Sequence, residues 1–219
     1  MEKTTVKKTK KKVTKAQFKA AFMEKILLSG HTPPSIYAFT KELNSPESTF
    51  YEYFNSFKSL EQEIWSDWIN ETIAILDKDP AYKDYTARER LLAFYYTWLE
   101  TITSHRSFIL KRFENVGKHE INPTFLIGLK DRFEEFVQGL IILGKDTTEI
   151  AERPFSSNYH KAFWLHFLFI TRFWVNDDSA GFEKTDAAVE KSVNLAFDLV
   201  GKGALDSMID FAKFMFQNR

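Results

Sequence analysis

The chain has 219 residues, which is enough for one large domain or two small ones. Its 44% of hydrophobic residues and its 22 Phe exclude a protein without a packed core, and eight Gly and six Pro are too few for the turns of an all-β fold. The absence of Cys excludes disulfides, thiolate metal sites and cysteine nucleophiles, and it is compatible with a cytoplasmic protein.

A basic segment precedes an acidic body. Residues 1–15 hold seven Lys and one Glu, a charge of 7 − 1 = +6, and the remaining 23 basic and 29 acidic residues give 23 − 29 = −6. Because residues 1–15 contain few apolar side chains, we predict a disordered arm that binds a polyanion or is solvated. Lys19, Glu24 and Lys25 interrupt the segment that follows, which excludes a secretory signal and favours the cytoplasm.

Two short helices joined by a tight turn are predicted between residues 35 and 54. Ser35 is suited to cap the first helix, and Asn44 tolerates the left-handed backbone that ends it. Ser45 is the predicted N-cap of the second helix, with Pro46 at its first position. Two helices arranged in this way form a helix-turn-helix.

Apolar residues recur at helical spacing through most of the remaining chain, and no segment is a convincing strand. The most apolar run, residues 163–170, is far shorter than the roughly 18 residues that cross a bilayer, and it reads as a buried helix. We therefore predict an all-α protein of about ten helices. The long ones are expected over residues 88–104, 107–115, 123–143, 159–175, 183–200 and 205–216.

Residues 49–54, with the sequence Thr-Phe-Tyr-Glu-Tyr-Phe, resemble the signature of the TetR-family regulators. Residues 39–44 are similar to the helix and turn that precede this signature in the family. The resemblance covers residues 18–65. It implies an N-terminal three-helix DNA-binding domain, a divergent helical domain that binds a ligand and dimerises, and repression that a small molecule relieves.

The resemblance divides the chain into three parts. These are a basic arm (1–15), a helix-turn-helix DNA-binding domain (16–62), and a larger antiparallel helical domain for ligand binding and dimerisation (63–219). The junction is expected inside the helix that starts near Lys58. The implied function is a ligand-responsive DNA-binding transcriptional regulator that acts as a repressor.

The candidate DNA-binding residues lie on the second helix of the motif, on its flanks and in the arm. Direct base readout would rest on Ser48, Thr49, Tyr51 and Asn55. The full set is Ser35, Ser45, Glu47, Ser48, Thr49, Tyr51, Tyr53, Asn55 and Lys58, with Lys10, Lys11 and Lys12 from the arm.

The charge of this region opposes DNA binding. Residues 35–60 hold two Lys and three Glu, a sum of 2 − 3 = −1, and the first Arg of the chain is Arg88. Glu47 and Glu52 would repel phosphates unless they point elsewhere, so the arm would have to supply the attraction. A lipid-binding or partner-binding protein on a TetR-like fold therefore stays open as the alternative, with the arm on an anionic membrane.

Other motifs favour a protein without a catalytic site. Residues 139–146 nearly match a phosphate-binding loop, but Asp146 replaces the required Ser or Thr, and the segment reads as a helix end closed by Gly144. No two of the five His are three or four residues apart, as a helical metal site requires. We expect no enzyme activity, metal or cofactor.

Aromatic stripes on the helices over 88–104, 123–143 and 159–175 predict a core or an elongated apolar cavity. His166 or Tyr95 would be the polar contact for an apolar or amphipathic effector, lipids included. The candidate lining residues are Tyr95, Trp98, Phe133, Phe136, Phe163, His166 and Phe167.

The last two helices, over 183–200 and 205–216, carry more apolar residues than one buried stripe uses, which predicts a homodimer interface. The surplus positions are Ala187, Val189, Val193, Leu195, Ala196 and Leu199 on the first helix and Ile209, Phe211, Phe214 and Met215 on the second.

Overall fold

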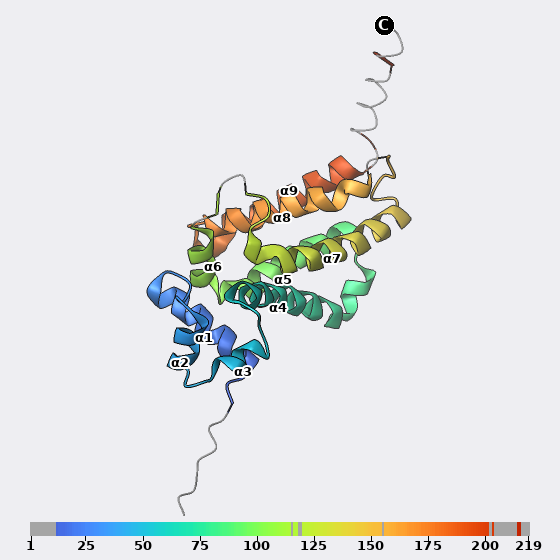
Figure 1. Cartoon of the computed structure of the whole chain (residues 1–219). Coiled ribbons are helices and arrows are strands. Elements are labelled where there is room, and N and C mark those ends of the chain that lie inside the picture. Colours follow the sequence, from blue (N-terminus) through green and yellow to red (C-terminus); the bar gives the residue numbers. More distant parts are fainter. Residues whose placement is uncertain are drawn as a thin grey trace, which may run out of the picture. The chain divides into compact units, whose positions relative to one another are not determined.

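The computed structural model describes residues 12–114, 116, 117, 120–154, 156–201, 203, 214 and 215 (Figure 1). These residues form nine α-helices and four short 3-10 helices without a strand, which confirms the all-α prediction. The chain divides into two compact units inside α4 (Phe57–Lys78), between Ile64 and Trp65. Within the described part, no helix is both long enough and apolar enough to span a bilayer.

Unit 1 is a three-helix core followed by the start of α4. Its helices are α1 (Lys15–Ser29), α2 (Ile36–Glu42) and α3 (Glu47–Tyr51). Thr14 begins α1 with a capping box, in which its hydroxyl accepts from the Gln17 amide and the Gln17 side chain accepts from the Thr14 amide. Phe18 is fully buried and packs edge-on against Phe50 of α3, with 5.5 Å between ring centroids.

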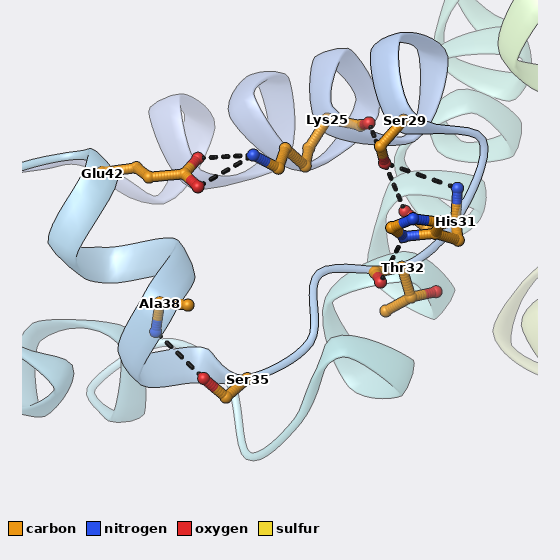
Figure 2. Close-up of polar contacts among 7 residues, drawn as sticks. All are labelled: Lys25, Ser29, His31, Thr32, Ser35, Ala38 and Glu42. Atoms are coloured by element: carbon orange, nitrogen blue, oxygen red, sulfur yellow. Dashed lines mark hydrogen bonds and ion pairs between the residues drawn. The ribbon is translucent and has the colours of Figure 1, made fainter.

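The turn between α2 and α3 follows the prediction in part. Ser35 caps α2, since its Oγ accepts from the Ala38 amide at 3.1 Å (Figure 2), and Asn44 is left-handed with a φ of 52°. The prediction that Ser45 is the N-cap of the second helix is wrong, because α3 begins at Glu47 and Pro46 holds the cap position. The Ser45 amide instead donates to the Thr40 carbonyl at 2.9 Å, which keeps it in the turn.

Unit 2 is built on four long helices. In Figure 1, α8 and α9 lie side by side, and α5 and α7 complete the bundle, with contacts between α5 and α7, α7 and α8, α8 and α9, and α9 and α5. The α-helices are α5 (Ala87–Thr103), α6 (Arg106–Phe113), α7 (Ile127–Asp146), α8 (Tyr159–Val175) and α9 (Glu183–Val200). The 3-10 helices are η1 (Pro80–Asp84), η2 (Thr124–Leu126), η3 (Ser156–Asn158) and η4 (Ala180–Phe182).

These bounds agree closely with the predicted ranges. The largest difference is at residues 123–126, where η2 precedes α7 as a separate turn. The predicted helix over 205–216 lies outside the described residues except for Phe214 and Met215, which are helical and about half-exposed.

Arg106 holds the connection between α8 and α9. Its guanidinium donates to the Trp174 carbonyl at 2.8 Å and to the Asp177 carbonyl at 3.0 Å, so it satisfies carbonyls at the end of α8. The same guanidinium lies 4.5 Å from the centroid of the Trp174 ring and 4.7 Å from that of Phe182. The Asp177 carboxylate then accepts from the amide of Thr185 at 2.9 Å, which fixes the start of α9.

The prediction that Gly144 closes a helix is wrong, because α7 continues to Asp146. Gly144 is buried, and its carbonyl accepts from the Ile150 amide at 2.8 Å. A Cβ added at Gly144 would lie 2.7 Å from Ile150 Cγ1 and Cδ1 and 3.2 Å from the Cβ of Ala87. The glycine is therefore required because the chain approaches α7 closely here.

Gly144→Ala is expected to lower the free energy of unfolding by about 1–3 kcal/mol, since Ile150 is itself buried and has little room to move. The matched control is Gly139→Ala on the same helix, where an added Cβ meets nothing within 4 Å. The control should gain about 0.5–1 kcal/mol from helix propensity. Urea unfolding of the three proteins measures both effects, and equal stability of the two variants would contradict the prediction.

Candidate functional sites

The exposed side chains of α2, α3 and the following turn form the candidate DNA interface. α3 buries Thr49 and Phe50 and exposes Ser48 and Tyr51, which is 51% exposed. Thr49, predicted as a reader of bases, is only 5% exposed, so the structure places it in the core of unit 1. Its place in the signature is explained by packing.

The other predicted residues divide by exposure. Lys12 is exposed, and Lys10 and Lys11 lie outside the described residues. The backbone N–H of Asn55 donates to Ser59 Oγ at 3.1 Å, and Asn55 is exposed. Of the remaining set, Ser35, Ser48, Tyr51, Asn55 and Lys58 are exposed, whereas Ser45, Glu47 and Tyr53 are half-buried.

Lysines of unit 1 neutralise two of the acidic groups that oppose DNA binding. Glu52 forms an ion pair with Lys12, and this hydrogen bond raises the pKa of the Lys12 ammonium. Glu42 of α2 binds Lys25 of α1 through both carboxylate oxygens, at 2.8 and 2.9 Å (Figure 2). The sequence did not reveal these pairs because the partners are 40 and 17 residues apart.

Tyr37 is a surface residue that the sequence analysis did not identify. It lies at the start of α2, is 59% exposed, and has the Lys41 ammonium 5.6 Å from its ring centroid. Together with Asn44 and Glu47 it borders a cleft along the turn. The sequence could have indicated this exposed position, because Tyr37 lies beside the apolar stripe of α2 and not within it. A large aromatic residue at such a position is not buried by its own unit.

The predicted cavity residues of unit 2 do not gather around one cavity. Tyr95, Trp98, Phe133 and Phe167 are fully buried and pack on one another. Phe167 lies 4.7 Å from Phe133 and 5.4 Å from Trp98 between ring centroids, so rings fill the space between α5, α7 and α8. Phe136 lines a pocket beside α4, and Phe163 and His166 line an open groove on α8 and α9.

His166 links three helices through hydrogen bonds. Its Nδ1 lies 2.9 Å from the hydroxyl of Tyr95, and its Nε2 lies 2.8 Å from Ser192 Oγ. Ser192 donates its proton to the Ala188 carbonyl at 2.6 Å, so Ser192 must accept from His166 Nε2–H, and Nδ1 accepts from Tyr95. Burial lowers the pKa of His166 to about 4, which keeps the ring neutral at pH 7.

A three-helix unit with a helix-turn-helix, followed by an all-helical unit, is the architecture that the resemblance to the TetR-family regulators implies. Residues 90–215, more than half of the chain, match the model of the tetracyclin repressor-like C-terminal domain. The chain belongs to the TetR family of transcriptional regulators, which confirms the resemblance seen at residues 49–54. Comparison with curated proteins gave no significant match.

Solved structures agree with this fold. A protein assigned to the TetR family of transcription regulators from Shewanella sp. PV-4 has a TM-score of 0.59 and 15% identity, over 87% of this chain and all of that one. A protein of unknown function from Rhodococcus sp. RHA1 gives 0.56 and 11%, over 90% of this chain and all of that one. A TetR-family regulatory protein from Rhodococcus RHA1 gives 0.51 and 14%, over 87% and 98% of the two chains.

Proposed function

We propose that the chain is a homodimeric, DNA-binding repressor that releases its operator when a small apolar molecule binds unit 2. The observation that supports DNA binding best is the surface of unit 1. Tyr37, Ser48 and Tyr51 are exposed there, while Lys25 and Lys12 neutralise Glu42 and Glu52. Such hydroxyl groups serve both phosphate contacts and base readout in the major groove.

The outer face of α8 and α9 supports a dimer. Leu165 and Phe169 on α8 and Leu195 and Leu199 on α9 are each 48–58% exposed, and they form an apolar surface that a single protomer leaves open. Two positions predicted for this interface, Val189 and Val193, are buried within the protomer and are not available to a partner. We propose α8 with α9 as the interface, and light scattering that gives a monomer at micromolar concentration would exclude it.

Tyr51→Ala tests DNA binding at the proposed surface. We expect it to weaken binding to the operator by about tenfold, because one well-placed contact to a base contributes about 1–3 kcal/mol. Tyr96→Ala is the matched control, since Tyr96 is 41% exposed and belongs to unit 2. Fluorescence anisotropy with fragments of the chain's own upstream region and with random DNA gives the two affinities.

One result of the DNA-binding experiment would favour the lipid-binding function over the repressor. If the wild-type protein does not distinguish upstream DNA from random DNA, yet binds vesicles that contain anionic lipid, the lipid-binding function takes its place. Equal losses for Tyr51→Ala and Tyr96→Ala would exclude α3 as the reading helix.

A further inference from the structure

Glu52 is an acidic residue at the end of the proposed reading helix. It is the C-cap residue of α3, directly follows Tyr51, and has a side chain that is 49% exposed. A carboxylate in this position repels the phosphates of DNA if it has no partner. Its partner in the structure is the ammonium of Lys12, which donates to Glu52 Oε2 although the two residues are 40 positions apart.

Further contacts hold the first described residues against the end of α3. Phe18 lies 6.3 Å from Tyr53 between ring centroids, and the Lys15 ammonium lies 5.6 Å from the centroid of the Phe54 ring. The capping box at the start of α1 fixes the backbone of Thr14. Residues 12–14 therefore lie beside the residues that follow α3, within the same unit.

The neighbouring lysines of α1 have another partner. Lys15 and Lys19 both pair with Glu63, at 2.5 and 2.7 Å between nitrogen and oxygen. Glu52 pairs with Lys12, which precedes α1 and is itself exposed. This ion pair therefore links α3 to the chain before α1, and not to α1 itself.

A lysine-rich segment, residues 2–11, is joined directly to Lys12. It holds five Lys and one Glu, a charge of 5 − 1 = +4. Because it continues from Lys12, it begins at the end of α3. An extended chain of ten residues reaches about 35 Å, which is roughly one helical turn of DNA. Lysines on such a chain reach phosphates next to the base pairs that α3 would contact.

We propose that Glu52 is a positioning residue for the lysine-rich segment, and that its ion pair with Lys12 directs residues 2–11 to DNA phosphates beside α3. This inference rests on the proposed DNA-binding function. A segment that is held close to its binding surface loses less conformational freedom when it binds. Glu52 then favours DNA binding, whereas a count of charges makes the same residue unfavourable.

Glu52→Gln tests this direction of the effect. The variant removes one negative charge, so a count of charges predicts tighter binding to DNA. We expect binding about threefold weaker than that of the wild-type protein, because an exposed ion pair contributes a small factor of this order. Fluorescence anisotropy at low salt with a random duplex of about 30 base pairs measures the affinity, since phosphate contacts do not depend on sequence.

Two further variants separate positioning from charge. Glu42→Gln is the matched control, because Glu42 is also exposed but pairs with Lys25 of α1 (Figure 2). This control should bind DNA as tightly as the wild-type protein or more tightly. When the five Lys of residues 2–11 are replaced by Gln, adding Glu52→Gln should no longer weaken binding, because no charged segment is left to position.

A measurement without DNA tests the positioning itself. The heteronuclear NOE of the Lys12 and Val13 amides reports how ordered the chain before α1 is on the fast timescale. It should fall in Glu52→Gln and stay unchanged in Glu42→Gln. Thermal unfolding should be nearly the same for all three proteins, because an exposed ion pair contributes little to stability.

The results that would overturn the proposal differ from those that would overturn the proposed function. Equal or tighter DNA binding by Glu52→Gln, or an unchanged NOE at Lys12 in this variant, excludes the positioning role of Glu52 alone. A loss of binding that persists after the five Lys are replaced excludes it as well. If the wild-type protein does not bind the duplex, the proposed DNA-binding function fails, and the role of Glu52 fails with it.

Discussion

Removal of residues 2–11 is expected to weaken DNA binding by about 100-fold at 50 mM salt, because this segment contains five Lys and one Glu. Each phosphate contact that is lost also lowers the salt dependence, by roughly 0.9 in the slope of log K against log salt. The slope should therefore fall by up to about 4. Anisotropy titrations between 50 and 200 mM salt measure both quantities.

The bounds of this deletion follow from the structure. The prediction of a disordered arm over residues 1–15 is wrong for residues 12–15, because Thr14 caps α1, Lys15 pairs with Glu63 at 2.5 Å, and Lys12 pairs with Glu52. A deletion of all fifteen residues would destabilise α1 and confuse the result. The matched variant keeps the length of the arm and replaces its five Lys by Gln. An unchanged salt slope in both variants would mean that the arm does not contact phosphate.

His166→Gln is expected to reduce the acid sensitivity of unit 2. Burial lowers the pKa of His166 to about 4, whereas the unfolded chain has a histidine pKa of about 6.5. The unfolded state therefore binds more protons between these values, so the wild-type stability is complete above pH 6.5 and falls as the pH falls towards 4. The loss from this one group amounts to about 3 kcal/mol.

Glutamine preserves the two hydrogen bonds without titrating, since its amide oxygen accepts from Tyr95 and its NH₂ donates to Ser192. Urea unfolding at pH 7, 5.5 and 4 should show the wild-type protein approaching or falling below the stability of the variant as the pH falls. His31→Gln, which replaces an exposed histidine of unit 1, is the matched control for the loss of an imidazole. Parallel pH profiles of the wild-type and His166→Gln proteins would contradict the lowered pKa of His166.

The sequence predicted features that depend on neighbouring residues in the chain. Apolar spacing gave the positions of α5 to α9, and the conformational preferences of Ser35 and Asn44 gave the first cap and the turn. The prediction that Ser45 is an N-cap was wrong, because α3 begins at Glu47 and the Ser45 amide donates to the Thr40 carbonyl. The prediction for Gly144 was wrong because α7 continues past it to Asp146, and the Gly144 carbonyl accepts from the amide of Ile150. Both residues take part in a hydrogen bond between positions five or six apart, which the spacing of apolar residues does not predict.

The candidate sites were less predictable, for a physical reason. Helical spacing shows that Trp98 and Phe133 face inwards, but it does not show whether the rings of other helices fill the space between them. Similarly, the acidic residues near α3 can be counted in the sequence. The charge that they present to DNA depends on Lys12 and Lys25, which approach these acidic residues only in the folded chain.

The contacts of Arg106 affect how unit 2 unfolds locally. Because one guanidinium binds the end of α8 and stacks on Phe182 before α9, the two helices share their stabilising contacts at the turn. Segments joined in this way tend to exchange their amide hydrogens as one cooperative unit. A partner seated on α8 alone would thus slow exchange along α9 as well, and association would appear in an exchange experiment as a single protected block.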